Sequence, residues 1–158
     1  KTEEGLKVVE FNCRFGDPET QVVLPLLESS LVDLLRTVAE GGSVAELKPA
    51  FREGAAVTTV VASGGYPGSY EKGKAITIPE DLEGDDLTVF HAGTRRTSDG
   101  GLETAGGRVL AVTAVGPTVS QAADRSRNAA AAIDFHGAFF RRDIGWRERA
   151  RTQHQEST

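Results

Sequence analysis

The sequence predicts an α+β protein, in which a strand and two helices precede a small β-rich unit with one packed helix. Three observations support this fold class. Residues 6–14 alternate in polarity with the period of a β-strand. Residues 15–40 carry helix start and stop signals around apolar positions at helical spacing. From about residue 55, short β-branched runs alternate with glycine-containing turns, and one helical pattern interrupts them.

The first strand is predicted over residues 6–14, LKVVEFNCR. Successive side chains of a strand point to opposite faces, so every second residue shares a face. Glu10, Asn12 and Arg14 therefore share one face, and apolar residues share the other face with Cys13. A cysteine on an apolar face is expected to be a small buried side chain and not a nucleophile.

Two helices are predicted to follow this strand. Asp17 is expected as the N-cap of the first helix, with Pro18 at its first helical position. Pro25 is expected to kink or end that helix because proline cannot donate a backbone hydrogen bond. One of the serines at positions 29–30 is expected to cap the second helix, and the glycine pair at 41–42 is expected to end it.

The rest of the chain is predicted to hold short strands separated by polar loops. The expected strands are residues 56–62, 75–78, 87–92, 108–115 and 137–142. A helix is expected over residues 117–133, between the last two strands. The polar tail after Trp146 is expected to fray.

Composition limits the classes of function. Apolar residues make up 39% of the 158 residues, so the chain can bury a core and is not disordered throughout. The net charge of −5, from 18 basic and 23 acidic residues, argues against a nucleic-acid surface, which needs clustered cations. A single cysteine excludes an intrachain disulfide and fits a cytoplasmic protein. No apolar run is long enough to span a membrane.

The chain is expected to be part of a larger protein. It contains no methionine, and it begins at Lys1 in what looks like the turn before a strand. The predicted boundary between its two parts lies near residues 40–54, where the helical pattern gives way to short strands.

The polar face of the first strand carries the most informative residues. A carboxylate and an amide oxygen two residues apart, from Glu10 and Asn12, can together hold a hard divalent cation. Arg14, one step further along the same face, can bind a carboxylate or phosphate through two hydrogen bonds. Strand alternation creates such triplets freely, and the spacing alone favours an ordinary half-exposed strand.

The surrounding sequence resembles the phosphoribosylamine–glycine ligases, a family of ATP-grasp enzymes. The resemblance is carried by VEFNCRFGDPETQ at residues 9–21, in which the E-x-N metal motif runs into R-F-G-D-P-E. It continues in SGGYPGSYEKG at 63–73, VFHAGT at 89–94, GGRVLAVT at 106–113 and RRDIG at 141–145. These segments extend over nearly the whole chain apart from the polar tail and some loops.

The resemblance implies a role for each matching residue of the first motif. Glu10 and Asn12 would bind Mg²⁺, or Mn²⁺, at the phosphates of ATP. Arg14 would be the catalytic residue that contacts an anion in the substrate pocket. The turn and helix start that line the pocket would consist of Gly16, Asp17 and Pro18.

The resemblance also implies a domain organisation. Residues 1–45 would be the C-terminal end of an ATP-grasp domain, formed by a strand plus helices. Residues 50–146 would be the family's small β-rich C-terminal domain with its packed helix, and residues 147–158 would be a polar tail. The segments that supply the adenine pocket and the phosphate-covering loop would precede this chain, so the isolated chain is expected to be inactive.

The implied activity is ATP-dependent amide formation between glycine and 5-phosphoribosylamine in purine synthesis, with no nucleic acid or membrane as partner. Two alternatives remain at this point: another ATP-grasp carboxylate–amine ligase, and a non-catalytic module that binds a partner. Arg108 follows a glycine pair, and the sequence leaves it either solvated or in reach of substrate.

Overall fold

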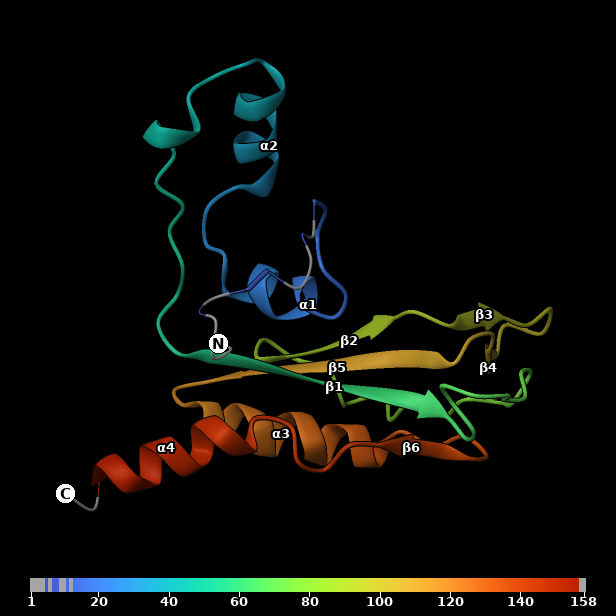
Figure 1. Cartoon of the computed structure of the whole chain (residues 1–158). Coiled ribbons are helices and arrows are strands. Elements are labelled where there is room, and N and C mark those ends of the chain that lie inside the picture. The colour runs from blue at the N-terminus through green and yellow to red at the C-terminus, as the bar shows by residue number, and fades with distance from the viewer. Residues whose placement is uncertain (1–4, 6, 9–10, 12, 157–158) are drawn as a thin grey trace.

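The computed structural model describes residue 5, residues 7–8, residue 11 and residues 13–156, and its centre is a four-stranded antiparallel sheet (Figure 1). The strands are β1 (Ala55–Ser63), β2 (Leu87–His91), β3 (Thr94–Arg96), β4 (Leu102–Thr104), β5 (Arg108–Gly116) and β6 (Ala138–Phe140). The α-helices are α1 (Thr20–Val23), α2 (Leu31–Ala39), α3 (Val119–Ala132) and α4 (Trp146–Glu156). Short 3-10 helices are η1 (Leu24–Leu26) and η2 (Val44–Glu46).

The strand order in the main sheet is β2-β5-β1-β6, and each strand runs antiparallel to its neighbours. The two long central strands are rich in valine, threonine and alanine, which suit a pleated surface. Their register runs from Ala55 opposite Gly116 to Val61 opposite Leu110. The pair β3–β4 forms a separate two-stranded hairpin.

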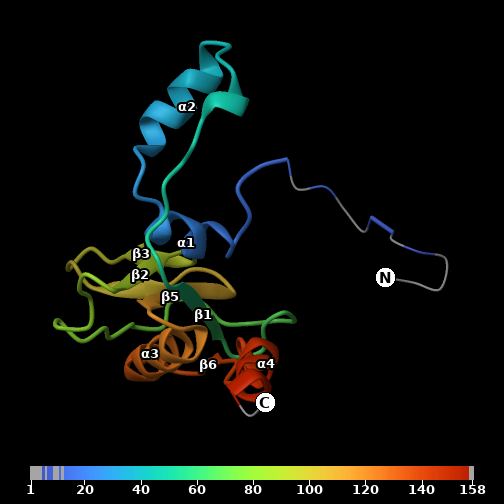
Figure 2. The ribbon, with the colours of Figure 1, turned by 90° about the vertical axis from the view of Figure 1, so that its left-hand side faces the viewer.

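Helices cover both faces of the central strands. α3 lies along one face of the sheet and α1 lies on the other, as two perpendicular views show (Figures 1 and 2). All of β5 after its first residue is buried, which explains its nearly continuous apolar sequence. The largest fully buried aliphatic side chains among the described residues are Val61, Val109, Leu110 and Val112.

Small side chains allow α3 to approach the sheet closely. The buried residues of this helix are Ala122, Ala123, Ser126, Ala129 and Ala130. Ser126 Oγ donates to the carbonyl of Val112 at 2.8 Å and lies 2.6 Å from Thr59 Oγ1. These buried polar atoms therefore satisfy one another and join the helix to both central strands.

The predicted helix ends are confirmed where the signals are local. α1 ends at Val23, just before the 3-10 turn that contains Pro25. Ser30 caps α2, since its Oγ accepts from the Asp33 amide at 3.3 Å. The chain leaves α2 through Gly41, whose φ of +76° is a conformation that glycine adopts without strain.

The predicted start of the first helix is wrong. The helix begins at Thr20, and its N-cap, Glu19, makes no capping hydrogen bond with its side chain. Asp17 does not act as N-cap because its carboxylate accepts hydrogen bonds from Gln21 Nε2 and from Arg108. A long-range ion pair thus replaces the local capping interaction.

The predicted first strand does not form in the described part of that segment. Residues 7–8, 11 and 13–14 lie outside every strand, and Cys13 is exposed where a buried side chain was expected. Phe11 is 83% exposed. A strand requires a hydrogen-bonded neighbour, and the sheet formed by β1, β2, β5 and β6 does not include this segment.

Three further elements differ from expectation. Residues 75–78 form only isolated bridges, from Ala75 to Glu103 and from Thr77 to Asp134. The hairpin β3–β4 was not predicted because its strands are short and polar. The tail was expected to fray, but residues 146–156 form α4, which Arg149 joins to Asp124 of α3 at 3.1 Å. No helix within the described residues is long and apolar enough to cross a bilayer.

Candidate functional site

The turn before α1 carries the predicted anion-binding residue. Arg14 is exposed, and its Nη1 donates to the adjacent carbonyl of Phe15 at 3.2 Å. The Gly16 carbonyl accepts from the amide of Thr20 at 2.9 Å and from its hydroxyl at 2.5 Å, which fixes the end of the turn on α1. The guanidinium of Arg14 has no acidic partner among the described residues, so it can take an anion from outside the chain.

Arg108 connects this turn to the sheet. Its Nη2 donates to Asp17 Oδ2 at 2.8 Å, and its Nη1 donates to the Asp17 carbonyl at 3.3 Å. Arg108 is the first residue of β5 and lies 91 positions further along the chain. The structure therefore brings together two segments that the sequence singled out separately, the R-F-G-D-P-E turn and the G-G-R turn.

The backbone around Arg108 is closely packed. The Ser63 amide donates to the Gly107 carbonyl at 2.8 Å, and the Ser63 hydroxyl donates to the Gly106 carbonyl at 2.9 Å. A side chain on Gly107 would place its Cβ 2.3 Å from the ring of Tyr66. Gly107 thus lets the loop after β1 lie directly against the start of β5.

A small polar hollow opens beside the same loop and has a volume of about 180 Å³. Its lining residues are Ser63, Gly64, Glu71, Lys74, His136 and Gly137. Lys74 Nζ lies 2.6 Å from Glu71 Oε2, and this hydrogen bond holds the pKa of the Glu71 carboxyl below its usual range. The hollow is therefore occupied in part by an ion pair of its own.

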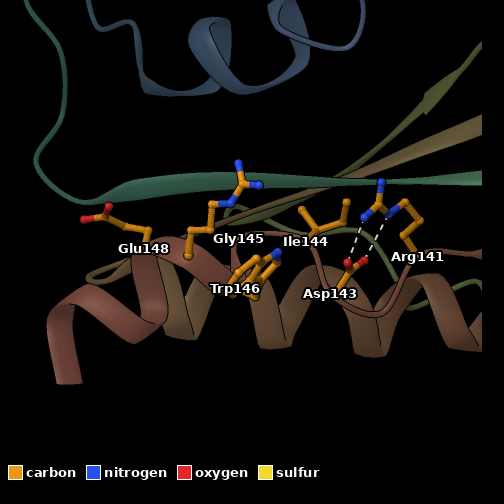
Figure 3. Close-up of a pocket in the computed structure, with 7 residues that line it drawn as sticks. Arg141, Asp143, Ile144, Gly145, Trp146 and Glu148 are labelled. Atoms are coloured by element: carbon orange, nitrogen blue, oxygen red, sulfur yellow. Dashed lines mark hydrogen bonds and ion pairs between the residues drawn. The ribbon is translucent and has the colours of Figure 1, made fainter. Parts of the chain in front are cut away.

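A larger open hollow, of about 490 Å³, lies between β6 and α4 (Figure 3). Arg141 forms two hydrogen bonds with Asp143 across it, at 3.0 and 2.7 Å. The hydrogen bond from Arg141 holds the pKa of Asp143 below its usual range. This ion pair follows directly after Phe140, the last residue of β6.

Only some of the predicted site residues belong to the part of the chain that the structure describes. Glu10 and Asn12 lie outside the described residues, so their metal role stays a prediction. No group of three His, Cys, Asp or Glu side chains in the described part of the chain is arranged to hold a metal ion. Arg14 and Asp17 lie in the turn that Arg108 holds, and Pro18 is half-buried there.

Sequence reasoning missed the contact between Arg108 and Asp17. The glycine pair before Arg108 signalled a special backbone, but no local pattern indicates which residue an arginine will reach. The sequence Asp17-Pro18 predicts a helix cap, and a capping pattern does not indicate a partner elsewhere in the chain.

The described fold is an antiparallel sheet with α3 on one face and the R-F-G-D-P-E turn held at its edge by Arg108. Residues 56–147 match the family model described as "Phosphoribosylglycinamide synthetase, C domain". The chain belongs to this family.

Curated relatives agree with this assignment. The chain is 51% identical over 142 residues to a phosphoribosylamine–glycine ligase of Nostoc sp., covering 89% of this chain and 33% of the relative. It is 56% identical to that of Chlorobaculum tepidum, covering 87% and 32%. It is 45% identical to the human trifunctional purine biosynthetic protein adenosine-3, covering 99% and 15%. The chain thus spans about a third of the length of the curated phosphoribosylamine–glycine ligases it matches.

Solved structures share the fold. The phosphoribosylamine–glycine ligase of Thermotoga maritima is 39% identical and superposes with a TM-score of 0.73, over 86% of this chain and 32% of that one. The biotin carboxylase domain of the 2-oxoglutarate carboxylase of Hydrogenobacter thermophilus has a TM-score of 0.57 at 20% identity, over 87% and 30%. This second likeness shows the fold alone.

Proposed function

We propose that this chain is the C-terminal part of an ATP-dependent ligase that joins glycine to 5-phosphoribosylamine, giving glycinamide ribonucleotide, ADP and phosphate. The observation that carries the proposal is the docking of the R-F-G-D-P-E turn on the family domain through Asp17 and Arg108. The identity of 51–56% to phosphoribosylamine–glycine ligases supports the same activity. The setting would be cytoplasmic, as for a biosynthetic enzyme with one free cysteine.

The proposed reaction has two steps. A carboxylate oxygen of glycine attacks the γ-phosphorus of ATP, the bond to the bridging oxygen breaks, and glycyl phosphate and ADP form. The amine of phosphoribosylamine then attacks the acyl carbon, loses a proton and expels inorganic phosphate. Such chemistry depends mainly on orientation and on neutralising negative charge.

The residues of this chain would supply part of that neutralisation. Arg14 would pair with an anionic group of a substrate, because its guanidinium is exposed and has no acidic partner among the described residues. Glu10 and Asn12 would hold Mg²⁺ or Mn²⁺, since carboxylate and amide oxygens suit a hard cation. The bound metal would neutralise charge on the phosphates of ATP.

The rest of the ligase would cover an exposed apolar surface on the N-terminal third of this chain. Exposed large apolar side chains are concentrated there, namely Val8, Phe11, Phe15, Val23, Val32, Leu35, Val38 and Phe51. α2 buries none of its residues and projects away from the sheet (Figure 1). A surface of this kind is typical of a contact with another domain, here the preceding part of the same protein.

ADP release by the full-length ligase tests the proposed function. We expect release only when glycine, phosphoribosylamine and a divalent cation are all present. A different ATP-grasp ligase would instead release ADP with another carboxylate or amine. A non-catalytic module would give no release with any of them, and either of these results would reject the proposal.

A further inference from the structure

We propose that Arg108 is a positioning residue for Arg14, acting through Asp17 to hold the anion-binding turn in place. The inference rests on the proposed function, because the role of Arg14 as a substrate contact belongs to that proposal. In this proposal a second arginine, from β5, contributes to substrate binding. Arg108 does so indirectly, without touching the substrate itself.

The first observation is the form of the contact. One guanidinium nitrogen of Arg108 binds the carboxylate of Asp17, at 2.8 Å, and the other binds the backbone carbonyl of the same residue, at 3.3 Å. The other carboxylate oxygen of Asp17 accepts from Gln21 Nε2 of α1 at 3.1 Å. Arg108 therefore restrains both the side chain and the peptide of Asp17, three residues after Arg14.

The second observation is that Arg108 is held more firmly by the fold than the turn it contacts. Arg108 opens β5, and the next two residues, Val109 and Leu110, are fully buried. The turn is held less firmly, since Arg14 is exposed and bonded only to its neighbour within the described chain. Among the described hydrogen bonds of residues 13–23, those from Arg108 are the ones that reach the sheet.

The third observation concerns charge. Asp17 has the only carboxylate within three residues of Arg14 in the sequence, and Arg108 is its ion-pair partner at 2.8 Å. While Arg108 occupies that carboxylate, Arg14 is left available for a substrate anion. Without Arg108, the negative charge of Asp17 would be uncompensated beside the anion-binding turn, which disfavours a substrate anion there.

A purely structural role explains this pair less well. Both side chains are about half exposed, at 40% for Arg108 and 49% for Asp17. Half-exposed ion pairs contribute little to stability because water screens them. The pair should therefore affect the geometry and charge of the turn more than the folding of the domain.

The test uses the full-length ligase with Arg108→Gln, Asp17→Asn and the double variant. For Arg108→Gln we expect the KM of one anionic substrate, glycine or phosphoribosylamine, to rise about tenfold, as for the loss of one charge-assisted contact. The KM of ATP and the midpoint of thermal unfolding should stay close to those of the wild type. The substrate whose KM rises is the one that Arg14 contacts.

The double variant separates positioning from direct contact. If Arg108 acts through Asp17, the double variant should be no worse than the more impaired single variant. If Arg108 touches substrate itself, the two losses should multiply, and the inference is overturned. Unchanged KM values for Arg108→Gln would also overturn it.

Two controls keep the test decisive. Arg95→Gln removes an ion pair of the same type, with Glu103 on the β3–β4 hairpin, and should leave every KM unchanged. Should Arg108→Gln fail to fold, Arg108→Lys replaces it, because lysine keeps the charge but cannot reach both acceptors of Asp17. A wild-type enzyme without glycine-dependent ADP release would reject the proposed function, whereas an active wild type with an unaffected Arg108→Gln would reject the positioning role alone.

Discussion

At the scale of single residues, arginine–carboxylate pairs set the local charge on the surface of this protein. Asp17, Asp86, Glu103 and Asp143 each accept from an arginine at 2.8 Å or less. Arg14 differs from these paired arginines, because its described hydrogen bond goes to a backbone carbonyl. Among the described residues, an arginine without an acidic partner is therefore located in the motif for which a substrate contact is proposed.

The ion pair between Arg141 and Asp143, in the hollow beside α4, gives a prediction about the pKa of the Asp143 carboxyl. The hydrogen bond from Arg141 favours the charged form of Asp143, so its carboxyl should take up a proton only below the ordinary range. Arg141→Gln should therefore raise the pKa of Asp143 toward its usual value, as measured by NMR titration of the carboxyl carbon. Asp99, whose pKa is lowered by Thr97 instead, serves as the control and should not change. An unaltered titration of Asp143 would contradict the assignment.

The metal motif gives a second prediction at this scale. Glu10→Gln removes the charged oxygen ligand but keeps the size of the side chain, so the fold should persist. In the full-length ligase, glycine-dependent ADP release should fall by about 100-fold or more, as for the loss of strong charge stabilisation at a phosphate. Circular dichroism should match that of the wild type. Full activity of this variant would refute the metal role of Glu10.

At the scale of elements, the contact between α3 and the sheet depends on a buried hydroxyl pair. Ser126→Ala should lower the free energy of unfolding by about 1–3 kcal/mol, because Thr59 then keeps a buried hydroxyl without its partner. Urea denaturation of this chain measures the change. Asn128→Ala, at an exposed position of the same helix, should change stability by no more than about 0.5 kcal/mol.

Thr59, the hydrogen-bond partner of Ser126, allows a check of the predicted loss of stability. Replacing both hydroxyls, in Ser126→Ala with Thr59→Val, removes the unsatisfied group and should cost less than the sum of the single changes. Additive losses would mean that the hydroxyl contact seen between α3 and β1 does not contribute to stability.

Elements whose signals lie within their own sequence could be predicted. β1, β5 and α3 have long apolar patterns, and the end of α1 follows from Pro25. α4 could not be predicted, because its sequence is polar and its link to α3 is an ion pair between Arg149 and Asp124. The start of α1 was misplaced for the same reason, since the partner of Asp17 lies 91 residues away.

The same distinction applies to the candidate site. The residue types of the R-F-G-D-P-E turn could be singled out from the sequence, because the chemistry of carboxylates, amides and arginine is fixed by residue type. Their arrangement could not, because it depends on how the turn docks on the sheet. Arg108 shows the difference, since its importance follows only from the fold.

At the scale of the whole molecule, two of the ion pairs between described residues join the N-terminal third to the sheet domain. Arg108 holds the turn before α1, and Arg52 of the connecting segment pairs with Asp86 at 2.8 Å, just before β2. The Arg52 amide also donates to the Leu26 carbonyl at 2.8 Å. Residues 13–52 and the family domain therefore form one connected structure.

The fate of the carboxylate oxygens of glycine tests the central claim most directly. The full-length ligase is incubated with ATP, phosphoribosylamine and glycine whose carboxylate carries heavy oxygen, and the released phosphate is analysed by mass spectrometry. The account predicts glycinamide ribonucleotide as product and one heavy oxygen in each phosphate, because glycyl phosphate passes that atom on when the amine displaces phosphate. Phosphate without heavy oxygen, or no glycine-dependent product, would contradict the account.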